Sequence, residues 1–113
     1  RLIPVGNMIR VTVKKKNHSY ASFHSKGHAG YADSGKDIIC AAVSALVITT
    51  VNSSETFTED EIELKEDDGE VFFRFTDPVS ERGTLLMDAL VLGLTQIEES
   101  CDGKYLEVIT KEV

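Results

Sequence analysis

The sequence is poor in cysteine and in positive charge, and each shortage excludes a class of protein. Two cysteines, Cys40 and Cys101, are too few to form the disulfide framework of a small secreted domain, so we expect reduced thiols. Only 12 lysines and arginines stand against 19 aspartates and glutamates, which gives a formal net charge of −7. Because nucleic-acid binders neutralise phosphates with cations, this charge predicts no direct nucleic-acid partner, whereas a basic partner would suit it.

Long apolar runs are also missing. The longest, Ile38–Val51, is interrupted by serine and threonine and falls short of the roughly 20 residues that a membrane span needs. We recognise no secretory leader and no low-complexity linker, so we expect a cytoplasmic protein without a membrane partner. We assign residues 1–7 to a vector-derived remnant or a disordered native arm, and residues 8–113 to a single domain.

Hydrophobic periodicity divides the chain into strands and helices. Strict alternation of apolar and polar residues predicts strands, and apolar residues spaced three and four apart predict helices. The predicted strands are 8–14, 19–26, 61–65, 70–75 and 105–109, and the predicted helices are 36–52 and 77–99. Asp68-Gly69 favours a tight hairpin turn, Asn52-Ser53-Ser54 predicts the end of the first helix, and Asp77-Pro78 predicts the start of the second.

The order of these elements, ββαββαβ, predicts an α+β fold. Short turns inside each strand pair favour antiparallel hairpins, so we expect a mainly antiparallel sheet with the two helices packed on one face. The first helix is apolar nearly all round, which is typical of a helix that is buried by its neighbours or by a partner chain.

A histidine and a cysteine 12 positions apart are the residues that point most directly to chemistry. His28 lies in a glycine-rich stretch with Gly27, Gly30 and Gly35, and Cys40 follows in the first or second turn of the first predicted helix. The positive end of a helix favours a thiolate, and a neighbouring histidine can take the thiol proton. The arrangement suggests a cysteine nucleophile with His28 as its base.

Nearby polar residues could support this pair, but each also has an ordinary structural explanation. Asp33 or Asp37 could orient the imidazole, although a carboxylate beside the thiol also disfavours the thiolate. Ser44 lies one turn beyond Cys40, where its hydroxyl could hydrogen-bond near the thiol or back to a helix carbonyl. Cys40 alone would also fit as a small buried apolar residue. Spacing by itself leaves the catalytic and the structural interpretations open.

A metal site is the other chemistry to consider for His24, His28 and Cys40. No further cluster of cysteine and histidine completes a tetrahedral set of ligands. The two histidines are four positions apart, but a strand-to-loop junction does not bring them together as a helix would. We therefore expect neither a metal nor another cofactor.

The segment around the pair resembles the signature of a known family. The resemblance is carried by Gly27-His28-Ala29, by Asp37-Ile38-Ile39-Cys40-Ala41 and by Ser44, which lies four positions after the cysteine. This pattern is similar to that of Prp, the family of ribosomal-processing cysteine proteases. Length and element order agree from Met8 to Val113, although only the motif region is specific.

The resemblance implies a fold, an activity and a set of site residues. Members of the family are bacterial, cytosolic homodimers of a ββαββα type that remove the N-terminal extension of the large-subunit ribosomal protein number twenty-seven, cutting after an aromatic residue. By motif position, His28 and Cys40 would form the catalytic dyad, Asp37 and Ser44 would support it, and the loop 30–35 would cover the site. Asp33 has no individual match in the pattern.

A function from a different class is also consistent with the sequence. The chain could be a non-catalytic, ribosome-associated module that binds protein, with Cys40 merely buried in its first helix. The two hypotheses differ in what they expect of Cys40. A protease needs a thiol that a peptide can reach, whereas a binding module does not.

Overall fold

Strands and helices in the computed structural model follow the predicted order. The structure describes residues 8–27, 34–67 and 69–113, and of residues 34–37 it describes only the backbone. The elements are β1 (Ile9–Lys16), β2 (Ser19–Lys26), α1 (Ser34–Phe57), β3 (Ile62–Asp67), β4 (Glu70–Phe75), α2 (Glu81–Ser100) and β5 (Leu106–Glu112). This order confirms the predicted ββαββαβ arrangement. The proposed N-terminal arm, residues 1–7, lies outside the described residues.

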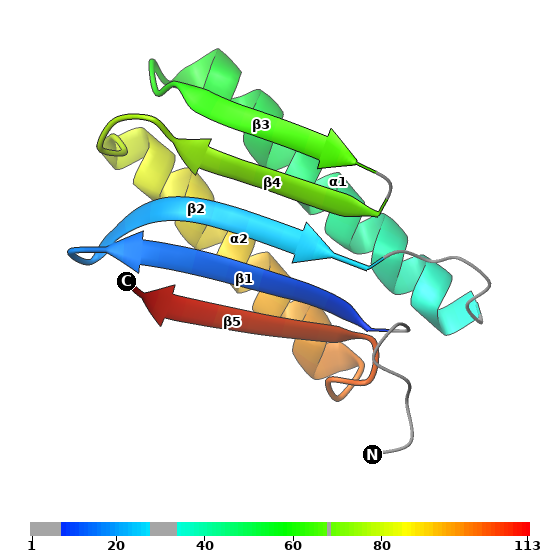
Figure 1. Ribbon diagram of the computed structural model, residues 1–113. Helices are drawn as coiled ribbons and strands as arrows, with labels where there is room; N and C mark the ends of the chain where they lie inside the picture. Colours follow the sequence, from blue (N-terminus) through cyan, green and yellow to red (C-terminus); the bar gives the residue numbers. More distant parts are fainter. Residues whose placement is uncertain (1–7, 28–33, 68) are drawn as a thin grey trace.

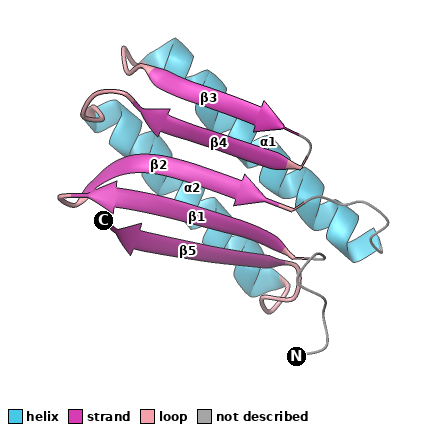
Figure 2. Cartoon of the chain, in the orientation of Figure 1, coloured by secondary structure: helices cyan, strands magenta, loops and turns pink. Residues whose placement is uncertain are grey.

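One five-stranded sheet carries both helices on the same face, as expected (Figures 1 and 2). The strand order is β3-β4-β2-β1-β5. The β1·β2, β2·β4 and β3·β4 pairs are antiparallel, which confirms a mainly antiparallel sheet. The β1·β5 pair is parallel, and the long crossover that such a pair needs is supplied by the segment that contains α2.

The core lies between the sheet and the two helices. Alternation along the strands points one set of side chains inward, where the rings of Phe23 and Phe73 stack with their centroids 5.0 Å apart. The helices approach each other closely at Gly93, where an added Cβ would lie 2.9 Å from the side chain of Leu46. The helical core residues are Val43, Val47 and Val51 of α1 and Met87, Leu90 and Leu94 of α2.

The first helix extends five residues beyond its predicted end, to Phe57. Asn52-Ser53-Ser54 was predicted to stop it, and that prediction is wrong. Thr50, just before this segment, bonds back one turn to the Leu46 carbonyl at 2.7 Å. Ser54 is completely buried and its hydroxyl has no hydrogen-bond partner among the described residues, so burial of the helix holds this polar segment in helical form.

The apolar part of α1 is 20 residues long, Ile38–Phe57. By length and composition alone, Ile38–Phe57 could cross a membrane, with a mean hydropathy of 1.5. The core helix of a soluble protein, which is mostly buried, passes the same test, and 28% of this stretch of α1 is buried inside the fold. In this fold Val43, Val47 and Val51 pack into the core beneath the sheet.

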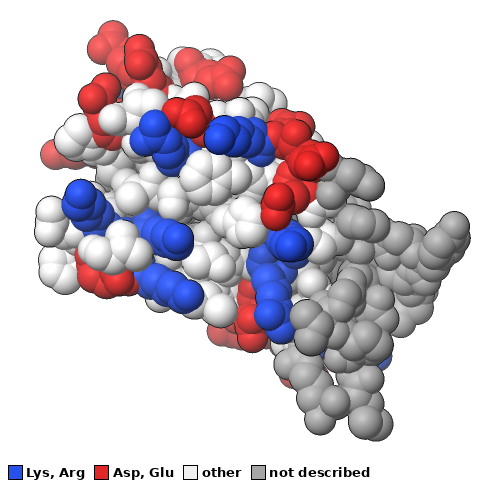
Figure 3. Space-filling view, in the orientation of Figure 1, with Lys and Arg blue, Asp and Glu red and all other residues white. Residues whose placement is uncertain are grey.

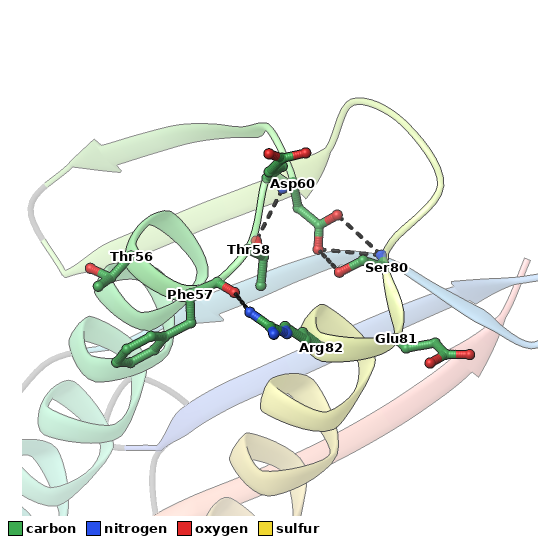
Figure 4. Close-up of a pocket in the computed structure, with 8 residues that line it drawn as sticks. Thr56, Phe57, Thr58, Asp60, Ser80, Glu81 and Arg82 are labelled. Carbon is green, nitrogen blue, oxygen red and sulfur yellow. Dashed lines mark hydrogen bonds between the residues drawn. The ribbon is translucent and has the colours of Figure 1, made fainter.

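The second helix begins at Glu81, four residues after the predicted Asp77 cap. Ser80 is the N-cap instead, and its hydroxyl accepts a hydrogen bond from the Gly83 amide at 3.0 Å. Asp60, from the segment after α1, fixes Ser80 by accepting hydrogen bonds from its amide and its hydroxyl (Figure 4). The partner that selects the cap lies 20 positions away in sequence, so the local Asp77-Pro78 signal was misleading.

The cavity beside this cap has a volume of about 770 Å³. Its polar groups bond to one another: Arg82 donates to the Phe57 carbonyl at 3.1 Å, and Asp60 receives the bonds from Ser80 (Figure 4). These groups join the C-terminal end of α1 to the start of α2. The cavity is therefore explained by the capping of a helix, and we do not assign it a ligand.

A hydrogen bond from Tyr20 on β2 to Asp88 on α2, 2.5 Å long, joins the sheet to the helix layer. Burial raises the pKa of the Tyr20 phenol well above its ordinary value of 10.0, and the hydrogen bond to Asp88 and the charge of Asp88 raise it further. The neutral phenol thus stabilises the fold below about pH 10, and this contribution falls as the pH rises beyond that value.

Tyr20→Phe is expected to lower the free energy of unfolding at pH 7 by about 0.5–1.5 kcal/mol, because it removes one hydrogen bond and leaves Asp88 in contact with solvent. It is also expected to flatten the loss of stability above pH 10. Urea unfolding at pH 7 and at alkaline pH measures both effects. A wild-type protein and a variant with parallel alkaline profiles would contradict the assignment.

Candidate active site

Cys40 lines a cavity of about 390 Å³ between the N-terminal part of α1 and the sheet. Its side chain is half-buried, so it is neither sealed in the core nor fully exposed to solvent. The other walls come from the end of β2, the β3–β4 turn and the next turn of α1. The lining residues are Ile9, Ser25, Gly27, Ala41, Val43, Ser44, Asp67, Gly69, Glu70 and Val71.

Cys40 is the seventh residue of α1, which begins at Ser34 and so places the thiol in the second turn. The predicted first or second turn is confirmed. The unpaired amides and the positive end of a helix belong to its first turn, however, and their effect fades beyond it. The helix end therefore stabilises a thiolate at Cys40 less than it would stabilise one in the first turn. Deprotonation of the thiol then depends more on a neighbouring base.

Gly27 joins the end of β2 to this cavity. Its φ of +111° suits glycine, and an added Cβ would lie 2.6 Å from the backbone oxygen of Met8. Its amide donates a 2.9 Å hydrogen bond to the carbonyl of Gly69, which has a φ of 71° as the predicted hairpin turn requires. The backbone at Gly27 is thus held against both the start of β1 and the β3–β4 turn.

Several predicted site residues lie outside the described residues, namely His28, Gly30 and Asp33. Gly27 immediately precedes His28 and forms part of the cavity wall. Ser44 is exposed on α1 and lines the cavity, as its place one turn after Cys40 predicts. The side chain of the predicted supporting residue Asp37 is also outside the description.

Gly35 was expected in the covering loop, together with the rest of segment 30–35. That assignment is wrong at its C-terminal end, because Ser34 and Gly35 already belong to α1. Glycine is tolerated there because the first turn of a helix makes few of the hydrogen bonds that an interior position must keep. The rest of the predicted covering loop, residues 30–33, lies outside the described residues.

His24 belongs to a different surface from Cys40. It lies on β2 next to the inward-facing Phe23, and its Nε2 atom is 3.0 Å from a carboxylate oxygen of Glu70. Within the described parts of the chain, no group of three histidine, cysteine, aspartate or glutamate side chains could hold a metal ion. The metal site considered for His24, His28 and Cys40 therefore gains no support from the described geometry.

An apolar groove continues from the Cys40 cavity between α1 and the β3–β4 hairpin. It has a volume of about 220 Å³ and shares Ser25, Val43, Ser44 and Val71 with the cavity. Its remaining lining residues are Val47, Ile48, Val51, Asn52, Glu55, Leu64 and Glu66. Binding sites for whole small molecules usually span roughly 300–1,000 Å³, so this groove suits a single side chain.

Carboxylates surround this combined site. Asp67 and Glu70 line the Cys40 cavity, and Glu55 and Glu66 line the groove. Their negative charge disfavours a thiolate and favours a basic ligand. These residues were not predicted from the sequence, although the Asp-Gly turn was. The missing information was the β2–β4 register, which pairs Lys26 with Glu70 and so brings that turn to Gly27.

The sequence around this site matches a known protein family. The family described as cysteine protease Prp matches residues 8–106. The chain belongs to the Prp family. It is therefore a cysteine protease of the ribosomal-processing type, as its resemblance to the family implied. The matched segment includes Cys40 and both walls of the cavity.

Named relatives of this Prp chain agree. It is 30% identical over 98 residues to the ribosomal processing cysteine protease Prp of Bacillus subtilis, covering 80% of this chain and 88% of that protein. The Prp of Staphylococcus aureus is 31% identical over 75 residues, which cover 65% of this chain and 71% of that protein.

Solved structures extend the agreement to the fold. A Streptococcus mutans protein has a TM-score of 0.83 at 29% identity, covering 96% of this chain and 97% of that one. The essential ribosomal processing protease Prp from S. aureus, in complex with a covalently linked product peptide, has a TM-score of 0.82 at 25% identity. The match covers 92% of this chain and 100% of that chain.

Proposed function

We propose that this Prp-family chain is a cytoplasmic endopeptidase that removes the N-terminal extension of large-subunit ribosomal protein number twenty-seven, with Cys40 as nucleophile and His28 as base. The observation that carries the proposal is the setting of Cys40. Its thiol is half-buried in a cavity wall, and Gly27, the residue before His28, lies in the same wall. A purely structural cysteine would not need to line a cavity that a peptide can enter.

The reaction consists of two transfers of the acyl group. His28 takes the thiol proton, and the Cys40 sulfur attacks the carbonyl carbon of the scissile bond. The C–N bond then breaks, the leaving amine receives the proton from the imidazole, and a thioester remains on Cys40. Water, deprotonated by His28, hydrolyses that thioester, releases the carboxylic acid and regenerates the thiol. The net reaction consumes one water for each peptide bond cleaved.

The negative charge on the carbonyl oxygen must be met by hydrogen-bond donors. The amide of Cys40, at the seventh helical position, is in the part of α1 where amides donate to carbonyls four residues earlier. The amides of the first turn, in the segment 34–37, have no such partner and are the donors we assign to this task.

The peptide substrate would lie along the groove that continues from Cys40. The apolar walls from Val47, Val51 and Leu64 would bury an apolar side chain beside the scissile bond. The surrounding carboxylates would attract the basic segments that are common in ribosomal proteins. The S. aureus Prp is in complex with a covalently linked product peptide, which supports a peptide as the substrate class of this chain.

Incubation with a synthetic peptide that spans the N-terminal extension and the start of the mature ribosomal protein tests the activity. Mass spectrometry is expected to show two fragments whose summed mass exceeds the peptide by one water. A scrambled peptide of equal composition serves as the control. If neither peptide is cleaved but the extension peptide still binds, the non-catalytic binding module becomes the better explanation.

We also propose that the chain forms a homodimer through its helix layer. Large apolar side chains remain exposed there, with exposed fractions of 68% for Ile38, 59% for Ile48, 68% for Leu85 and 60% for Leu92. An apolar helical surface of this kind is typical of an interface between two copies of a chain. It also explains why α1 is apolar on sides that the sheet does not cover.

Leu85→Glu is expected to convert the dimer to a monomer, because it would place a charge in the centre of an apolar interface. Leu85 is exposed in the single chain, so the substitution should leave the Tm of the monomer nearly unchanged. Sedimentation velocity at micromolar concentration measures the assembly. Thr56→Glu, at an exposed polar position of α1, is the matched control and should stay dimeric. A monomeric wild-type protein would refute the proposal.

A further inference from the structure

The face of the sheet opposite the helices is not covered by any described element of the chain (Figures 1 and 2). Successive side chains of a strand point to opposite faces of the sheet, so the neighbours of buried core residues point to the uncovered face. Examples are His24, next to the buried Phe23, and Phe72, next to the buried Phe73. We call this surface the open sheet face. Its central strands are β4, β2 and β1, which hold six, eight and eight residues.

Positive charge is concentrated on the open sheet face, although the chain as a whole is acidic. Among the residues that the structure describes, lysines and arginines outnumber carboxylates on this face, whereas carboxylates outnumber them in the whole chain, 19 to 12. Its basic residues are Arg10, Lys14, Lys16, Lys26, Lys65, Arg74 and Lys111. Its acidic residues are Glu63, Asp67, Glu70 and Glu107.

Several of these cations lie next to one another in the sheet. Lys14 on β1 is level with Lys111 on β5, and Arg10 on β1 is level with Lys26 on β2. Like charges at neighbouring positions destabilise a sheet. Such a pattern is explained when a ligand of opposite charge occupies the face and offsets the repulsion.

Only part of this charge is neutralised within the chain. Arg10 pairs with Glu107 at 3.7 Å, and Arg74 pairs with Glu63 at 2.8 Å. The lysines of the face make no ion pair with any residue that the structure describes; they are Lys14, Lys16, Lys26, Lys65 and Lys111. Their ammonium groups are exposed and remain available to an anionic partner.

The centre of the open sheet face is partly aromatic, and the Glu70 carboxylate lies beside it, 3.0 Å from the Nε2 atom of His24. Figure 3 views this face and shows the blue cationic side chains in groups around a white centre. Phe72 lies level with Lys65 in the β3·β4 register, and the ring of His24 is tilted 56° to that of Phe72 with 6.4 Å between the centroids. These two rings line a hollow of about 480 Å³ together with Lys65, Glu66, Asp67 and Glu70.

We propose that the open sheet face binds single-stranded nucleic acid. The surrounding lysines would contact successive phosphates, and bases would stack on Phe72 and His24, which is the combination that single-strand binders use. The carboxylates at the edge of the hollow would accept hydrogen bonds from base amino groups. An acidic protein would use the same lysines but would have no need of the exposed aromatic rings.

The proposal replaces the expectation that was drawn from the net charge of −7. A net charge averages over the whole surface, whereas a phosphate backbone meets one face at a time. Because the remainder of the chain is acidic, binding should be weak and strongly dependent on salt. We expect a Kd of about 10⁻⁴–10⁻⁶ M at physiological salt, with a slope of about −0.7 in log Kobs against log salt for each phosphate contacted.

Fluorescence anisotropy with a labelled 12-nucleotide single-stranded RNA, and with DNA of the same sequence, tests the proposal over a range of potassium chloride concentrations. Lys14→Glu is expected to weaken binding and to reduce the salt slope by about one phosphate contact. Phe72→Leu keeps the charge and is expected to weaken binding roughly fivefold or more through the loss of stacking. Lys104→Glu changes the net charge equally outside the face and should have little effect.

Each outcome of this experiment decides the matter. Weakening by Lys14→Glu and Phe72→Leu, but not by Lys104→Glu, supports the proposal, and the RNA and DNA series show which polymer is preferred. Equal weakening by both lysine variants would mean a general charge effect and would overturn it. The proposal would also be overturned if oligoglutamate competed as effectively as RNA and Phe72→Leu had no effect. That result would indicate an acidic protein partner instead. Thermal unfolding confirms that each variant is folded.

Discussion

Cys40→Ser is expected to lower kcat/KM for cleavage of the extension peptide by roughly 10⁴-fold or more, because a hydroxyl without a matched base does not replace a catalytic thiol. The substitution is nearly isosteric, and the Cys40 side chain is only half-buried, so the fold should be retained. Initial rates at several peptide concentrations, together with a thermal unfolding curve, separate a loss of chemistry from a loss of structure.

Cys101→Ser is the matched control. Cys101 is also half-buried, but it caps the C-terminal end of α2, where its thiol donates to the Glu98 carbonyl at 3.5 Å. Serine can make the same bond, so activity should stay within about twofold of wild type. If Cys40→Ser and Cys101→Ser cleave equally well, the assignment of the nucleophile is wrong.

His28→Ala separates the base from the nucleophile. General acid–base catalysis commonly contributes about 10²–10⁴-fold, so a loss in that range is expected with little change in KM. The second-turn position of Cys40 strengthens this expectation, since the helix end alone gives its thiolate limited support. A fully active His28→Ala variant would show that another group takes the proton.

The sequence predicted the fold well wherever the signal was local. The alternation in 19–26 matches β2 to the residue, because a strand with one buried face must place every second side chain inward, and the apolar return after the Asp-Gly turn in 70–75 matches β4 to the residue. The predictions failed where a contact between residues far apart in sequence determines the local structure. Asp60 selects Ser80 as the cap of α2, and packing carries α1 through three polar residues that would end an isolated helix.

In the candidate site, too, the features set by local sequence could be predicted and those set by long-range contacts could not. Cys40 and Ser44 could be predicted because helical spacing places them on one side of α1. The groove, its Leu64 wall and the carboxylates around it depend on the register that brings the β3–β4 hairpin beside Gly27. No pattern within a single element specifies that register. The concentration of lysines on one face of the sheet is hidden in sequence for the same reason.

Leu64→Lys is expected to reduce kcat/KM for the extension peptide by roughly 10- to 100-fold, mainly by raising KM. Leu64 faces inward on β3, level with the buried Phe73, yet its exposed fraction is 38%, so part of its apolar surface remains uncovered in the groove. We infer that a substrate side chain covers that surface. A lysine would place a charge where an apolar side chain must be desolvated, and the loss of one such contact accounts for a change of this size.

The effect on KM distinguishes the groove from the catalytic pair. Since Leu64 is on the edge strand β3 and does not line the Cys40 cavity, Leu64→Lys should leave the rate of alkylation of Cys40 by iodoacetamide unchanged. Thr56→Lys adds the same charge at an exposed position near the other end of α1, and it should cleave the peptide like the wild type. If Leu64→Lys retains the wild-type KM, the peptide follows a different path from Cys40, and the exposed surface of Leu64 must be covered by something other than substrate.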